Sequence, residues 1–292
     1  MRVTQSMLAQ NSLRHLSQGY SKLGNLQDQL STGKKITRAS QDPVVAMNGM
    51  RYRSQTVEVG QFQRNLSEVY NWMDSSDAAL DESTQALQRV RELTTQASND
   101  TYEEGQRSNI AEEVAQLKEH LISIANTKSN NKYIFNGQDT TNPPVDENGS
   151  TSSDGKGDVE IELLKGVTIP VNSDPQNVFS DQLFQDLEDL ESALLDENTS
   201  GEDLSGFIDT IDGHINNAVN ERAELGARMN RVEMIESRLG EQEVIAERIM
   251  SENEDADMEE VIIKLMSQEN VHRAALSAGA RIIQPSLMDF LN

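Results

Sequence analysis

The fold class of this chain follows from residues 208–239, which read IDTIDGHINNAVNERAELGARMNRVEMIESRL. Apolar side chains recur here at steps of three and four residues, the spacing that places them on one face of an α-helix. A helix with so long a stripe needs partners to cover it, so this stretch predicts a bundle of long helices. The seam positions are Ile208, Ile211, Ile215, Ala218, Arg222, Leu225, Met229, Val232 and Leu239.

A second seam precedes it, in a helix that we expect to begin at Asp42-Pro43. Asp can cap the free N–H groups there, and Pro suits the first helical turn. A third helix should follow a turn at Asn99-Asp100 and Gly105, and helices joined by a short loop run antiparallel. The second helix repeats Leu66, Met73, Leu80, Leu87 and Thr94 at sevens, with Val69, Ser76, Ser83, Val90 and Ala97 as companions; the third carries Ile110, Val114, Leu117, Leu121 and Ile124.

The middle and the two ends have a different character. Turn-forming residues gather from Asn130 to Asn177, where VEIELL and VTIPVN are β-type runs separated by Lys165-Gly166. Helical spacing returns from Phe179 to Leu194. Each end of the chain carries a weakly apolar amphipathic helix, the first of which ends near Gly33.

These patterns predict a mainly α protein, an elongated bundle of long antiparallel helices with a small β-rich inserted domain and two terminal helices. We divide the chain into a first terminal helix (1–41), a first bundle part (42–132), the insert (133–177), a second bundle part (178–257) and a last terminal helix (258–292).

Composition and charge exclude several classes of function. Only 36% of residues are apolar and 4% aromatic, which suits narrow helical seams better than one broad core. The net charge of -24 argues against a general nucleic-acid binder, because phosphates would be repelled. Residues 1–60 carry eight Lys and Arg against three acids, so the arm could pair with acidic copies of the chain or simply be solvated.

No constellation of residues points to catalysis, a cofactor or a metal. The chain has no cysteine, and His15, His120, His214 and His272 lie on four different predicted helices without metal-ligand spacing. Nucleophile and phosphate-loop motifs are absent, as are a cleavable signal peptide and a membrane-length apolar run. We therefore predict a protein that is not an enzyme and takes no cofactor.

Three segments, taken in order, resemble the flagellin-like family. They are LSTGKKITRASQDPVVA (30–46), LQRVRELTTQASND (87–100), and a tail made of ERAELGARMNRVE (221–233) with the residues from Glu254 onward. YIFNGQDTTNPP (133–144) and the ending SLMDFLN resemble the hook-filament junction members of the family more than flagellin. The resemblance covers nearly the whole chain apart from residues 145–160.

This resemblance implies a structural adaptor between the flagellar hook and the filament, with flagellin itself as the alternative. It implies terminal helices that pair on assembly, export in an unfolded state through the flagellar type III apparatus with an export chaperone, and a final position in the secreted flagellum. The implied partners are copies of itself, the first hook-associated protein and flagellin. An intracellular coiled-coil scaffold remains a rival reading.

The assembly interface that we predict lies mainly on the terminal helices. Ordering residues 1 to about 40 and 258–292 costs roughly 1–2 kcal/mol of backbone entropy per residue, which thin apolar faces offset only with neighbours. We expect these ends to be mobile in the monomer. Arg89 and Arg91 either contact acids on a neighbouring subunit or pair with nearby acids of their own helix. The interface residues are Leu13, Leu16, Leu23, Leu30, Arg89, Arg91, Leu265, Ala275, Ala278 and Ile282.

Overall fold

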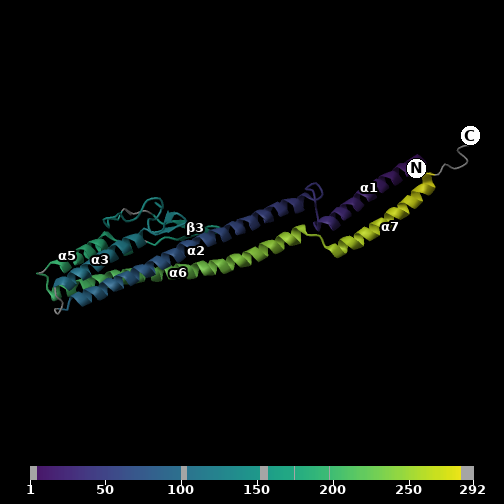
Figure 1. The fold of residues 1–292 in the computed structure, drawn as a ribbon. Coiled ribbons are helices and arrows are strands. Elements are labelled where there is room, and N and C mark those ends of the chain that lie inside the picture. The colour runs from purple at the N-terminus through teal and green to yellow at the C-terminus, as the bar shows by residue number, and fades with distance from the viewer. Residues whose placement is uncertain (1–4, 100–103, 152–156, 174, 197, 284–292) are drawn as a thin grey trace, which may run out of the picture. The chain divides into compact units, whose positions relative to one another are not determined.

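The computed structural model describes all residues except 1–4, 100–103, 152–156, 174, 197 and 284–292. The chain divides into two compact units, one made of residues up to Glu58 and from Gln242 onward, and the other of Val59–Glu241. The described residues form long helices with short strands between them, which confirms the predicted fold class (Figure 1).

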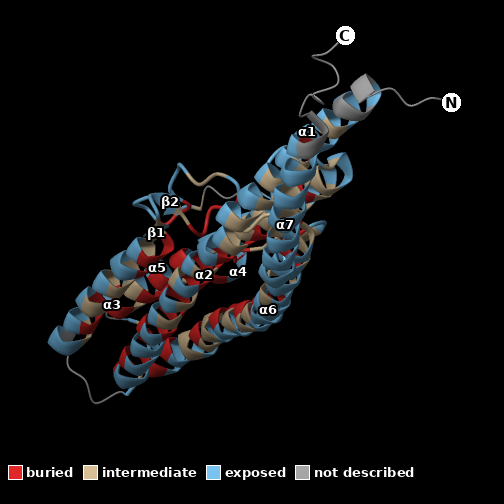
Figure 2. Ribbon diagram, turned by 90° about the vertical axis from the view of Figure 1, so that its right-hand side faces the viewer, coloured by how far each residue is buried: buried red, intermediate tan, exposed pale blue. Residues whose placement is uncertain are grey.

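The unit from Val59 to Glu241 is the helical bundle. It contains most of α2 (Pro43–Ala97), α3 (Glu104–Ala125), α5 (Asp181–Leu195) and most of α6 (Gly201–Glu254). Arg89 pairs with Glu113 and, farther from the connecting turn, Glu82 contacts His120, so α3 runs antiparallel to α2. Figure 2 shows the buried residues of this unit on the faces that the helices turn toward one another.

The heptad positions predicted for α2 are all buried. Met73 and Leu80 have no exposed surface, and the polar members Ser76, Ser83 and Thr94 have none either. Each of these three hydroxyls donates to the carbonyl four residues earlier in its own helix, at 2.8–3.0 Å, so all three are hydrogen-bonded within the seam. Small polar residues therefore occupy core positions without a hydrogen-bonding penalty.

The seam of α6 is buried at Ile211, Ala218, Leu225, Val232 and Leu239, whereas Ile208, Ile215 and Met229 are only half-buried. The one cation of the seam, Arg222, has partners on α2. Arg222 binds Asp77 on α2 through its Nε at 2.7 Å and also pairs with Asp81. The guanidinium thus lies at the edge of the seam and joins α6 to α2. Helix α2 begins as predicted, since Asp42 Oδ1 accepts from the backbone N–H of Val44 at 2.9 Å.

The strands form two small hairpins. The predicted pair is β3 (Glu160–Leu164) with β4 (Val167–Pro170), antiparallel, with Gly166 at a φ of +77° in the turn. A second hairpin, β1 (Lys128–Ser129) with β2 (Lys132–Tyr133), was not predicted. The described residues between the hairpins and α5 are mostly loops, with one helical turn, α4 (Pro175–Val178).

The other unit contains α1 (Gln5–Thr32) and α7 (Met258–Ile283). Both are largely exposed, in contrast to the bundle (Figure 2). The two helices contact each other along their length within the single chain. Their predicted ordering only among neighbouring subunits stays a prediction.

Candidate assembly surface

The terminal helices pair through a heptad seam that ends in close glycine contacts. Helix α7 runs antiparallel to α1, because Gln268 lies near Gly19 while Gly279 lies near Leu16. A β-carbon added to Gly279 would be 3.7 Å from Leu16 Cδ1, an ordinary van der Waals contact, so Leu16 packs against α7 at Gly279. The seam positions, which alternate in steps of three and four, are Leu16, Gly19, Leu23, Leu26 and Leu30 in α1 and Val261, Leu265, Gln268, His272, Ala275 and Gly279 in α7.

The predicted interface residues fall into two groups. Five of them belong to the seam and are half-buried by the partner helix of the same chain: Leu16, Leu23, Leu30, Leu265 and Ala275. Leu13, which is 57% exposed, and Ala278 instead face water. The side chain of Ile282 lies outside the described residues.

A larger apolar surface adjoins the seam, and Leu13 is the one predicted interface residue that belongs to it. Tyr20, Ile262, Met266 and Leu276 are also exposed. Tyr20, Ile262, Met266 and Leu276 each directly follow a seam position in sequence. Leu13 follows Ser12, which lies four residues before Leu16 and continues the seam spacing of α1 toward the N-terminus. One residue along a helix is a rotation of about 100°, and in an antiparallel pair that rotation leads to the same side of both helices. We call Leu13, Tyr20, Ile262, Met266 and Leu276 the outward face.

The opposite side of the pair is a polar groove. Lys22, Asn25 and Gln29 directly precede seam positions of α1, and Lys264 and Ser267 precede seam positions of α7. Two lysines, Lys22 and Lys264, thus lie on the side of the pair opposite the outward face.

A buried carboxylate ties the terminal helices to the adjoining ends of α2 and α6. Glu254, 7% exposed, accepts from Arg53 Nη2 at 2.7 Å and lies 3.5 Å from Lys34 Nζ. The hydrogen bond from Arg53 lowers the pKa of Glu254, against the effect of burial, and Lys34 adds to the lowering. Lys34 Nζ also binds Asp255 at 2.7 Å, which lowers the pKa of that carboxyl.

Backbone hydrogen bonds reinforce this junction. The N–H of Lys35 donates to the carbonyl of Glu254 at 2.7 Å, and the N–H of Ala256 donates to that of Gly33 at 2.8 Å. A β-carbon on Gly49 would lie 2.9 Å from Glu254 Oε1, so the carboxylate would have to shift if another residue stood there. We call Lys34, Arg53, Glu254 and Asp255 the junction cluster.

The two arginines predicted for the interface already have partners in the single chain. Arg89 pairs with Glu113 on α3 at 2.7 Å and with Glu92 of its own helix at 3.2 Å. Arg91 pairs with Asp212 on α6 at 2.6 Å. Both side chains remain about half exposed, at 49%, so each retains surface for a further partner.

No group of three or more metal-ligating side chains gathers among the residues that the structure describes. His214 instead pairs with Asp186 at 2.7 Å between α6 and α5. None of the helices in the described part of the chain has a stretch long and apolar enough to cross a membrane.

Comparison with known proteins identifies the relatives of this arrangement. The family model of the bacterial flagellin N-terminal helical region matches residues 3–140, and that of the C-terminal helical region matches residues 208–291. The flagellar hook-associated protein 3 of Escherichia coli is 24% identical over 95% of this chain and 96% of its own length.

A flagellin matches part of the chain in sequence, and a solved structure has a similar fold. A flagellin of Clostridium tyrobutyricum is 31% identical, but over 47% of this chain and 37% of its own length. The crystal structure of the flagellar junction protein FlgL from Legionella pneumophila has a TM-score of 0.58 at 16% identity, covering 71% of this chain and all of that one. At that identity the likeness concerns the fold alone.

Proposed function

Because this chain belongs to the flagellin-like family of structural flagellar proteins, we propose that it is the adaptor that joins the flagellar hook to the filament. The observation that carries this proposal is the match to hook-associated protein 3 from end to end. Flagellins cover less of the two chains: that of Listeria innocua is 25% identical over 88% of this chain and 87% of its own length, and the 31% match to a Clostridium tyrobutyricum flagellin covers less than half of either chain. The role is structural, and we assign the chain no catalytic activity.

The outward face supports an assembly role on physical grounds. Its five side chains have exposed fractions from 41% to 71%, and they lie on one side of a two-helix pair that has little core of its own. Fully burying a large apolar side chain contributes about 1.5–3 kcal/mol. Contacts with neighbouring subunits would supply that burial. Assembly would thus bury the outward face of the terminal helices, which brings no stability to a monomer as long as it stays exposed.

The remaining parts of the proposal concern place and partners. We propose that the chain is exported unfolded by the flagellar type III apparatus with the help of a chaperone, and that it resides at the hook-filament junction. Its neighbours there are copies of itself, the first hook-associated protein and flagellin. The proposed interface consists of Leu13, Leu16, Leu23, Leu30, Arg89, Arg91, Leu265, Ala275, Ala278 and Ile282. We also retain the proposed division of the chain into five parts, which end at residues 41, 132, 177, 257 and 292.

Flagellin is the second candidate function, favoured by the local identity of 31%. The two functions differ in abundance, because flagellin fills the filament whereas a junction protein is scarce. Removal of the gene from its own organism tests the choice. We expect hooks to remain while unpolymerised filament protein accumulates in the medium. Cells that lack filament protein altogether would identify the chain as flagellin, and unaltered filaments would refute both functions.

A further inference from the structure

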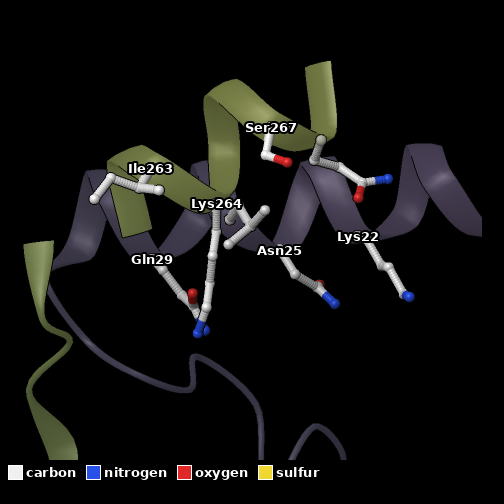
Figure 3. Close-up of a pocket in the computed structure, with 8 residues that line it drawn as sticks. Lys22, Asn25, Gln29, Ile263, Lys264 and Ser267 are labelled. Atoms are coloured by element: carbon white, nitrogen blue, oxygen red, sulfur yellow. The ribbon is translucent and has the colours of Figure 1, made fainter. Parts of the chain in front are cut away.

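The groove between the terminal helices has the size and chemistry of a binding site. It measures about 500 Å³, within the roughly 300–1,000 Å³ typical of ligand pockets. Figure 3 shows Lys22, Asn25 and Gln29 projecting from α1 on the side where Lys264 projects from α7. Leu26 and Ile263 add apolar surface, and two ammonium groups flank it. The groove therefore suits a segment with apolar side chains and a negative charge.

Lys22 is available for such a partner. It forms no ion pair with any residue that the structure describes, whereas Lys264 binds Glu260 one turn earlier at 2.9 Å. A chain with a net charge of -24 offers acids in abundance. The occupant should combine apolar side chains and a negative charge in a short segment.

Residues 284–292, QPSLMDFLN, have this combination. Four apolar residues surround a single charge, Asp289. The groove and this tail are thus complementary in charge and in apolar character. They could meet within one chain or between two copies.

The reach of the chain favours the arrangement between two copies. Lys264 and Ile283 are nineteen residues apart in α7, about 28 Å at 1.5 Å per residue. From Ile283 to Asp289 there are six residues, which span at most about 21 Å when fully extended. A tail that turned back would also spend residues on the reversal. Pairing within one copy would therefore need a fully extended tail and extended lysine side chains, whereas the tail of a second copy meets no such limit.

We infer that the groove between α1 and α7 receives residues 284–292 of a second copy of this chain. Asp289 pairs with Lys22 and Lys264, and the apolar residues on either side of it cover Leu26 and Ile263. Such a contact is head-to-tail, since the tail end of one copy meets the middle of the terminal pair of the next, and head-to-tail contacts generate rings or helical tubes. The inference rests on the proposed function and names the surfaces through which copies join.

Disulfide trapping tests this contact directly, because the chain has no cysteine of its own. Two full-length variants, Ser267→Cys in the groove and Met288→Cys in the tail, are produced together in cells of the native organism that lack the gene. Flagella are isolated, oxidised and analysed without reducing agent. The matched control replaces Ser267→Cys by Gln27→Cys, an exposed position at the same level of the pair but on the side of the outward face.

We expect the Ser267–Met288 pair to give covalent dimers at least about tenfold more abundant than the Gln27 pair, in cells whose motility is restored. Motile cells with no dimer, or with equal yields from both pairs, would overturn the inference and leave the proposed function standing. Failure of the unaltered chain to restore motility would instead refute the proposed function. As a second readout, Lys22→Glu combined with Lys264→Glu should reduce motility, and adding Asp289→Lys should restore it. If Lys22→Glu with Lys264→Glu leaves motility unchanged, the contact is contradicted.

Discussion

Replacing two residues of the outward face should separate assembly from folding. Ile262 and Met266 are 41% and 61% exposed, and neither is a seam position of the terminal pair. Changing both to Ser should alter the free energy of unfolding of the isolated chain by no more than about 0.5 kcal/mol, because surface substitutions rarely do more.

In the assembled flagellum the same two side chains lose burial that neighbours provide. About half of each side chain is exposed in the single chain, so its further burial should contribute about 0.75–1.5 kcal/mol, half the value for a fully buried residue. The two together amount to about 1.5–3 kcal/mol, which weakens attachment of a subunit roughly tenfold to hundredfold.

Urea unfolding measures the first quantity, and the fraction of filament protein shed into the medium measures the second. Leu195→Ser is the matched control, because Leu195 is 57% exposed at the end of α5, in the other unit. It should change neither quantity. Normal filament attachment by the double variant would show that the outward face is not an interface. A lower free energy of unfolding of the isolated double variant would show that the outward face packs within the monomer.

Three further substitutions probe other parts of the structure. Leu80→Ala, in the fully buried seam of α2, should lower the free energy of unfolding by about 2–5 kcal/mol, as followed by fluorescence of the single buried tryptophan; a loss below 1 kcal/mol would contradict the packed seam. The pKa of Glu254 is lowered, so its pairing stabilises the folded chain above the ordinary pKa of 4.5, and this stabilisation is lost as the pH falls through the folded-state pKa. Glu254→Gln should therefore reduce the loss of unfolding free energy at acid pH, measured by urea titrations. An unchanged pH profile would refute the pairing with Arg53. Arg89→Glu combined with Arg91→Glu should impair motility by more than the stability loss explains, and intact motility would remove both residues from the interface.

The bundle could be predicted from sequence because each of its helices repeats one spacing over many turns. Leu66, Met73 and Leu80 are buried as the period requires, and so is Ser76, whose polarity alone would have placed it on the surface. The spacing therefore predicted burial more reliably than hydrophobicity. The antiparallel hairpin at Gly166 was likewise predictable, because glycine readily adopts the positive φ of its turn.

Other features depend on contacts between residues far apart in the sequence. The short β1–β2 hairpin turns at Asn130 and Asn131, which adopt φ values of 49° and 65°; two adjacent asparagines were its signal. Burial of Glu254 depends on Arg53 and Lys34, more than two hundred residues away along the chain, so no local pattern could reveal it.

The outward face shows the limit most clearly. In α7, each of its residues stands next to a seam residue, so the apolar stripe looked like one broad seam. Only the packing of α7 on α1 divides it into a covered part and an exposed part. Ile262 and Met266 were missed for that reason.

Amide hydrogen exchange of α1 and α7, measured in the isolated full-length chain and again in assembled flagella, tests the central claim most directly. We predict only weak protection of the helix pair in the isolated protein and strong protection in the assembly, because neighbouring subunits supply the burial that the helix pair lacks. Equal, strong protection of both helices in the isolated chain would contradict the account.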